Sequence, residues 1–147
     1  MISRFDETRR QLAAVISAAF AAAAAEGLLP TAEAAPFVVE VPGDTANGDF
    51  AANAAMVNAR AMRMAPQKLA ALLTERFDFG SLPVERCEVA GPGFINFYME
   101  QSWFASLTGE VLQKGEAFGR SDYGRGEKVM VEFVSANPTG PMHMGNA

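Results

Sequence analysis

The large apolar side chains in the first part of the chain follow helical spacing. They form one stripe of an amphipathic helix, made of Ile2, Phe5, Leu12, Ile16 and Phe20. Ser3 can cap the start of this helix, and Gly27 can end it. The pattern therefore predicts a long, alanine-rich helix over residues 3–26.

Two further helices are predicted over residues 50–64 and 66–76. The first follows an Asn-Gly-Asp turn that ends in Asp49, a residue type that caps helices. The second begins at Pro66, whose missing N–H group is not needed in the first turn of a helix. We expect Asp49 to cap the helix over residues 50–64.

Apolar runs bounded by turn residues predict three strands, at residues 37–41, 84–90 and 94–99. The last two are joined by a Gly-Pro-Gly turn, and a helix over residues 101–118 follows them. Helices alternating with short, hairpin-linked strands are typical of an α+β layer domain. We expect residues 1–118 to form helices packed on a small, mainly antiparallel sheet.

The chain changes character after residue 118. Residues 119–127 are polar and rich in glycine, which is typical of a linker. Residues 128–134 are apolar and β-branched, which predicts a buried strand. Without sheet partners, however, this strand should leave an apolar edge exposed. We interpret residues 128–147 as the truncated start of a second, nucleotide-binding α/β domain.

Composition narrows the class of protein. Half of the 147 residues are hydrophobic and 20% are charged, so a packed core is expected. The net charge of −5 argues against a general nucleic-acid binder, although it leaves room for a local contact with a folded RNA. Cys87 is the only cysteine, so no internal disulfide forms, and no Cys/His cluster indicates a metal site.

The first 25 residues also have features of a secretory signal, since Arg9-Arg10 precedes an apolar run. Asp6 and Glu7 lie where such a signal is basic, and the apolar stripe is helical. No stretch is apolar enough to span a bilayer. We therefore expect a cytoplasmic protein.

The segment from Val129 to Ala147 carries the candidate chemistry. A predicted strand ends in a turn made rigid by two prolines, followed by the only histidine and by small residues. A loop of this kind, leading into a helix N-terminus, directs backbone N–H groups at an anion. His143 and Asn146 can donate hydrogen bonds to phosphate oxygens, and Gly145 leaves room for a ligand ring.

The run His143-Met144-Gly145-Asn146 resembles the HIGH signature of class I aminoacyl-tRNA synthetases, with Asn146 in place of the second histidine. The longer run resembles arginyl-tRNA synthetases through Glu132, Ser135, Asn137, Pro138 and Gly140. The segments Gly48–Met56, Ala65-Pro66 and Gly91–Asn96 are similar to the N-terminal additional domain of that family. The resemblance implies that residues 128–147 begin a Rossmann-like catalytic domain.

The resemblance also implies a reaction and its substrates. Arginine attacks ATP, with Mg²⁺ expected, and the activated arginine passes to tRNA(Arg). His143 and Asn146 would be catalytic, with ATP bound by His143, Gly145 and Asn146 within the HIGH-type region from Ala136 to Asn146. The resemblance implies that arginine is held by Glu132, Ser135, Asn137 and His143, and that a D-loop base at the tRNA elbow is held by Phe94, Asn96 and Asp49.

Other interpretations stay open. Phe94 alternates with apolar neighbours and fits a packing role as well as an RNA contact, and Gly48-Asp49 fits a simple turn. The whole chain could be a non-catalytic tRNA-binding module, or part of another nucleotidyl-transferring enzyme with an HxGH-like loop. On the leading interpretation the full-length ligase is a monomer, and these 147 residues alone are inactive because the second ATP motif is missing.

Overall fold

The computed structural model describes residues 4–122 and 124–132, and its longest helix confirms the first prediction. Helix α1 spans Arg4–Ala25. It buries one stripe of side chains, namely Thr8, Leu12, Ile16, Ala19, Phe20 and Ala23. The helix ends before Gly27, whose φ of 76° suits glycine. Phe5 lies at the margin of the stripe and is 37% exposed.

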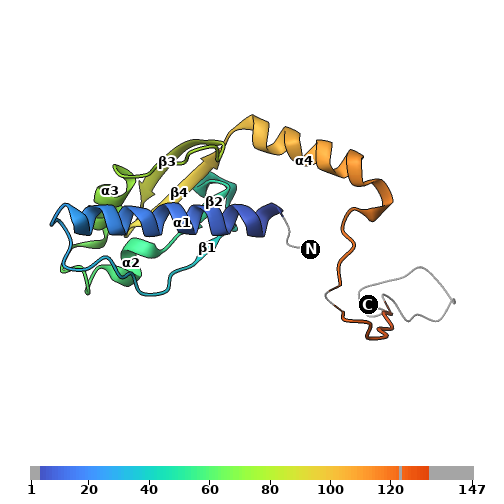
Figure 1. Cartoon of the computed structure of the whole chain (residues 1–147), viewed down its shortest axis with the longest axis horizontal. Coiled ribbons are helices and arrows are strands. Elements are labelled where there is room, and N and C mark those ends of the chain that lie inside the picture. The colour runs from blue at the N-terminus through green and yellow to red at the C-terminus, as the bar shows by residue number, and fades with distance from the viewer. Residues whose placement is uncertain (1–3, 123, 133–147) are drawn as a thin grey trace, which may run out of the picture. The chain divides into compact units, whose positions relative to one another are not determined.

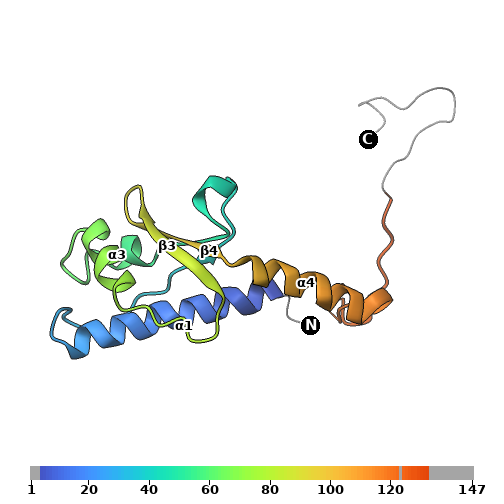
Figure 2. The ribbon, with the colours of Figure 1, turned by 90° about the horizontal axis from the view of Figure 1, so that it is seen from above.

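The sheet has four antiparallel strands in the order β1-β2-β4-β3. These are β1 (Val39–Glu40), β2 (Phe50–Ala52), β3 (Val84–Ala90) and β4 (Phe94–Met99). Both hairpin strands that the sequence predicts, β3 and β4, are confirmed, as is the mainly antiparallel sheet. Figures 1 and 2 show α1 crossing one face of this sheet, while the short 3₁₀ turn η1 (Thr45–Asn47) lies on the other side.

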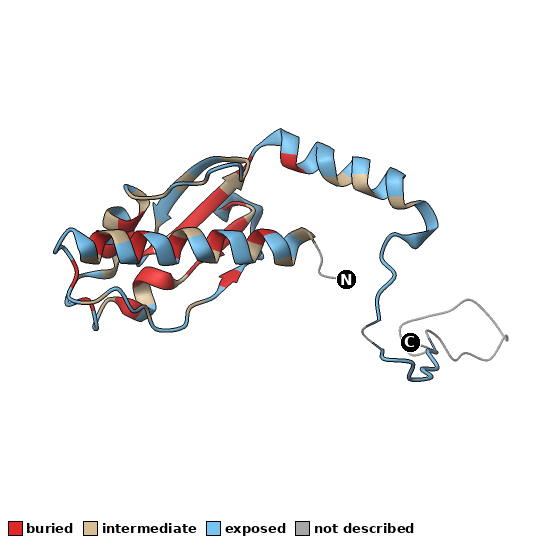
Figure 3. Cartoon of the chain, in the orientation of Figure 1, coloured by how far each residue is buried: buried red, intermediate tan, exposed pale blue. Residues whose placement is uncertain are grey.

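The core lies between the sheet and its helices. Phe50, Ile95 and Phe97 are fully buried on the sheet, and they cluster with Phe20 of α1 and Leu69 of α3. Helix α3 spans Pro66–Thr74 with its proline in the first turn, as the sequence predicts. Figure 3 shows that the buried residues, in red, gather where α1, α3 and the sheet meet.

The predicted helix over residues 50–64 is wrong. Residues Phe50–Ala52 form β2, and only Ala54–Asn58 form a helix, α2. Residues Phe50–Ala52 form a strand instead of a helix because β2 pairs with both β1 and β4 and buries all three of its residues. Asn53 ends it, since its Oδ1 accepts a hydrogen bond from the backbone N–H of Val38 at 2.9 Å. Tertiary pairing here overrides the helix propensity of the alanines.

Helix α4 (Gln101–Lys114) begins directly after β4 and buries a single side chain. Trp103 is its only buried residue, and the indole N–H donates to Thr8 Oγ1 at 3.1 Å. The rings of Phe5 and Phe50 meet Trp103 edge-on at centroid distances of 5.0 and 5.9 Å. The helix ends earlier than predicted and is followed by a 3₁₀ turn, η2 (Gly115–Ala117).

The chain divides into two compact units between Phe118 and Gly119. In the second unit the predicted buried strand is wrong for the described residues 128–132, which have no regular secondary structure. Val129 and Met130 are 74% and 96% exposed. This exposure agrees with the expectation for a strand-forming run without a neighbouring strand. Residues 133–147 lie outside the described residues, and the assignment of a second domain stays a prediction.

No helix among the described residues is both long and apolar enough to cross a membrane.

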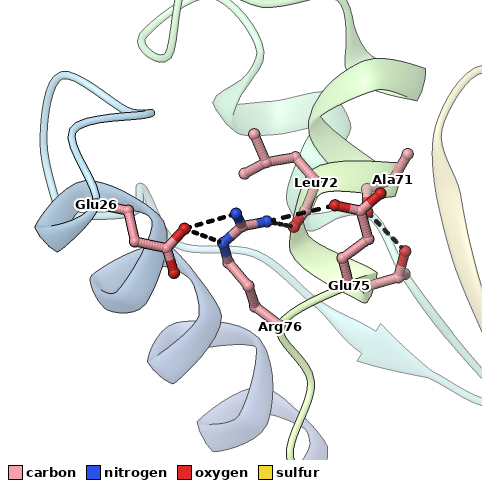
Figure 4. A network of polar contacts seen from close by, with 6 residues as sticks. Glu26, Ala71, Leu72, Glu75 and Arg76 are labelled. Atoms are coloured by element: carbon pink, nitrogen blue, oxygen red, sulfur yellow. Dashed lines mark hydrogen bonds and ion pairs between the residues drawn. The ribbon is translucent and has the colours of Figure 1, made fainter.

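Arg76 joins the ends of α1 and α3 (Figure 4). Its Nε and Nη2 donate to Glu26 Oε2 at 3.1 and 2.6 Å, and its Nη1 donates to the carbonyl of Leu72 at 2.7 Å. The hydrogen bond to Glu26 is the main reason that the pKa of Arg76 is raised. Arg76 therefore has a structural role.

Replacing Arg76 tests this role. We expect Arg76→Ala to lower the urea concentration at the midpoint of unfolding, because a charge-assisted pair and a carbonyl partner are lost together. Urea titration measures the change. Arg60→Ala is the matched control, since Arg60 is exposed, and it should change stability by less than about 0.5 kcal/mol. Equal effects of the two substitutions would contradict the role.

Candidate functional site

Strand β4 divides its side chains between two faces. Ile95, Phe97 and Met99 point into the core, whereas Phe94, Asn96 and Tyr98 alternate with them and point to the opposite face. The register places Asn96 in a row across the sheet, beside Ala51 of β2 and Glu88 of β3. We call this second face, which lies opposite the core, the open face.

A pocket of about 260 Å³ lies on the open face. Phe94 and Asn96 form part of its wall, together with Ala51 on the neighbouring strand. The rest of the wall comes from the ends of β1 and β3 and from the loop or turn that follows each, and is made of Glu40, Pro42, Gly43, Asn47, Ala90 and Gly91. Its volume lies just below the range of about 300–1,000 Å³ that holds drug-sized ligands, so it suits a single small ring. The structure thus brings together two of the predicted RNA-binding residues.

Asn96 is the most unusual residue of this pocket. It is 3% exposed, yet no group among residues 4–122 and 124–132 hydrogen-bonds to its side-chain amide. Its amide atoms are not among the buried unpaired atoms of the described residues, so they stay accessible from the pocket. The Asn96 amide can therefore offer both a donor and an acceptor to a ligand in the pocket.

Asp49 has a different role from the predicted helix cap. Its backbone N–H donates to the carbonyl of Phe97 at 2.9 Å, and its Oδ2 accepts from the N–H of Met99 at 2.8 Å. The prediction that it caps a helix is wrong, because the residues that follow it form a strand. Asp49 does not line the pocket, and a contact between Asp49 and RNA stays a prediction.

Gly48 allows this close approach of the loop to β4. A Cβ atom at this position would lie 2.7 Å from the carbonyl oxygen of Phe97. Its φ of 89° and ψ of −174° belong to a region that essentially only glycine adopts. The sequence indicates a turn here, but not that its glycine is packed against the backbone of a distant strand.

A cluster of three side chains lies beside the pocket on the open face. The guanidinium of Arg86 stacks on the ring of Tyr98 at 3.5 Å, and its Nε donates to Glu88 Oε1 at 2.9 Å. The Tyr98 hydroxyl lies 3.0 Å from the carbonyl of Ala46 and 3.3 Å from Glu88 Oε2. The hydrogen bond from Arg86 is the main reason that the pKa of Glu88 is lowered.

A larger hollow of about 430 Å³ lies elsewhere, where the start of α1 meets Trp103. Its lining is polar and includes Arg4 and Glu110, which form an ion pair at 3.8 Å. None of the predicted site residues lines it. The described residues also contain no group of three or more His, Cys, Asp or Glu side chains that could hold a metal ion.

Most of the residues predicted to bind ATP and arginine lie outside the described part of the chain. Glu132 is described and exposed. The HIGH-type region predicted from Ala136 to Asn146 lies wholly outside the described residues, and so does Ser135. This covers every other residue predicted for ATP or arginine, namely Ser135, Ala136, Asn137, His143, Gly145 and Asn146. Their roles stay predictions.

Cys87 is half-buried, and burial raises the pKa of its thiol.

Comparison with known proteins supplies the family. Residues 8–99 match the family model described as the arginyl tRNA synthetase N-terminal domain. The chain belongs to the arginyl-tRNA synthetase family. The matched range includes most of α1, the whole sheet and every residue of the pocket.

Curated relatives agree. The chain is 43% identical to an arginine–tRNA ligase of Desulforamulus reducens, over 97% of this chain and 25% of that protein. It is 47% identical to one of Moorella thermoacetica, over 96% of this chain and 25% of that protein. With one of Acetivibrio thermocellus it shares 39% identity over 100% of this chain and 26% of that protein. The chain thus spans about a quarter of the length of these relatives.

Several residues of this arginyl-tRNA synthetase site were missed in the sequence. Glu40 reaches the pocket because β1 pairs with β2, and Pro42 and Asn47 reach it because the loop before β2 lies over the sheet. Tyr98 had a usable signal, since it continues the alternation of Phe94 and Asn96 along one strand.

Gly48→Ala tests the close approach of the loop to β4. We expect a loss of at least about 3 kcal/mol in the free energy of unfolding, because a Gly-only conformation and a backbone clash coincide. Gly80→Ala is the control, since Gly80 also has a positive φ of 55° but open space around it. That control should cost about 1–2 kcal/mol. Thermal or urea unfolding of both variants measures the difference, and equal losses would refute the clash.

Proposed function

We propose that this chain forms the tRNA-binding front part of an arginine–tRNA ligase. The full-length protein would activate L-arginine with ATP and transfer it to tRNA(Arg) in the cytoplasm. The observation that best supports the RNA-binding part is the pocket in which Phe94 lies beside Asn96, whose amide has no hydrogen-bond partner among the described residues. The family supports the reaction.

The chemistry of the pocket suits one unstacked base. An aromatic ring can stack on the face of a base, and an amide can pair with the donors and acceptors on its edge. Phe94 and Asn96 lie two residues apart on β4 and so present both groups on one side. We propose that the ligand is a D-loop base at the tRNA elbow.

Charge around the pocket favours recognition of a base over recognition of phosphate. Glu40 lines the pocket, and Asp44 and Glu88 lie on the adjoining loop and strand. Carboxylates repel a phosphate group, whereas an uncharged base tolerates them. Strong non-specific binding of RNA, which depends on neutralising phosphates, is therefore not expected of this face.

The proposed catalytic residues are those of the His143 loop. Negative charge builds on phosphate oxygens when the arginine carboxylate attacks ATP, and fixed donors lower that barrier. We assign this role to His143 and Asn146, with Gly145 leaving room for adenine. Asn146 donates as a neutral dipole where the usual histidine can carry a charge. The arginine would be held by Glu132, Ser135 and Asn137, and Mg²⁺ would accompany ATP.

A tRNA-binding module without catalysis is the second candidate. Residues 2–118 form a compact unit with the pocket inside it, so binding needs none of the proposed catalytic residues. Arginine-dependent exchange of pyrophosphate into ATP by the full-length protein separates the two candidates. A panel of other amino acids in the same assay tests a different nucleotidyl-transferring enzyme.

The pocket generates a prediction about tRNA binding. We expect Asn96→Ala in the full-length protein to raise the KM for tRNA(Arg) about tenfold, because an edge contact worth about 1.5 kcal/mol is lost. Phe94→Leu should act similarly, since it keeps an apolar side chain but loses stacking. Aminoacylation kinetics measure both, with pyrophosphate exchange unchanged. An unaltered KM for tRNA in both variants would remove the pocket from the binding site.

The His143 loop generates a prediction about ATP. We expect His143→Ala to slow arginine-dependent pyrophosphate exchange by roughly 100-fold or more, as loss of one donor to a developing negative charge costs about 3 kcal/mol. Binding of tRNA, measured by gel shift, should not change. Normal exchange without this imidazole would disprove the assignment of the loop.

A further inference from the structure

The loop over residues 42–48 forms one wall of the pocket, and its position is set by few contacts. Asp44 Oδ1 accepts from the N–H of Ala46 at 2.9 Å, which closes the turn on itself. Gly48 and Asp49 fix its end on β4. Between these points, a side chain from the sheet holds the loop, and that is Tyr98, through the carbonyl of Ala46.

Tyr98 is placed to act on the pocket without entering it. It lies two residues beyond Asn96 on the same face of β4, but it is not among the lining residues. Arg86 on its ring and Glu88 beside its hydroxyl fix the direction of the side chain. The hydroxyl has one proton, which it can donate to Ala46 or to Glu88.

We propose that Tyr98 is a positioning residue for tRNA binding, which holds the wall over residues 42–47 at the distance from Asn96 that a base requires. This inference rests on the proposed function. Because Asn47 and Pro42 line the pocket on either side of Ala46, a shift of that carbonyl moves the wall. Loops held by few contacts open readily, so one hydrogen bond can set how often the wall is in place.

The test compares Tyr98→Phe with the unchanged full-length protein. This substitution keeps the ring and its contact with Arg86, but it removes the hydroxyl. We expect the KM for tRNA(Arg) to rise about three- to tenfold, the range for one net hydrogen bond, with kcat and pyrophosphate exchange unchanged. Hydrogen exchange of the Asn47 and Gly48 amides should accelerate by a similar factor, since both close the turn.

Thr74→Val is the matched control. It also removes a hydroxyl that donates to a backbone carbonyl, that of Ala71 at 2.9 Å, but within α3. It should leave both the KM for tRNA and the exchange of the loop amides unchanged. If Tyr98→Phe does not fold, Arg86→Met gives a second test, because it frees the ring and keeps the hydroxyl. That variant should shift both measurements in the same direction by about two- to fivefold.

The outcomes separate this inference from the proposed function. A raised KM in Asn96→Ala with an unchanged KM in Tyr98→Phe overturns the positioning role and leaves the proposed function standing. A raised KM in Tyr98→Phe without faster amide exchange overturns it too, since Tyr98 would then contact the RNA itself. An unchanged KM in both variants overturns the proposed function of the pocket.

Discussion

The close approach of Gly48 and Asp49 to strand β4 is the constraint on which the sheet and the pocket both depend. Two hydrogen bonds join Asp49 to β4, and they place Phe50 opposite Phe97 in the core. β1 pairs only with β2, so its position follows from the same contact. The loop before Gly48 must then turn back over the open face, where it forms the wall of the pocket.

Strand β4 serves stability and recognition through its two faces. The residues that point into the core determine how the strand packs against the helices. The alternate residues lie on the open face and do not take part in that packing. A rigid strand holds Phe94 and Asn96 at a fixed spacing, which a loop could not do as well. The adjustable part of recognition is thereby confined to the loop over residues 42–48.

The sequence pattern predicted those parts of the fold that depend on interactions between residues close together in the chain. The hairpin of β3 and β4, the stripe of α1 and the proline at the start of α3 could all be read from spacing and turn residues. Residues 50–64 could not, since their alanines favour a helix and only pairing with two strands makes Phe50–Ala52 extended. Phe94 and Asn96 were singled out by the family resemblance, and their spacing of two places them on one face of a strand. The loop that completes their pocket could not be predicted, because it depends on contacts between residues about 50 positions apart, such as Asp49 with Met99.

The amide of Asn96 is the feature of the pocket that favours binding of a ligand. Its amide atoms are not among the buried unpaired atoms of the described residues, so they keep contact with the pocket that Asn96 lines. Ala51, directly opposite in the register, offers no polar side-chain group to this row of the sheet. A ligand in the pocket would supply the hydrogen-bond partners that this amide lacks among the described residues. Together with the carboxylates around the pocket, this favours an uncharged, edge-polar ring as the ligand, which is what a nucleobase offers.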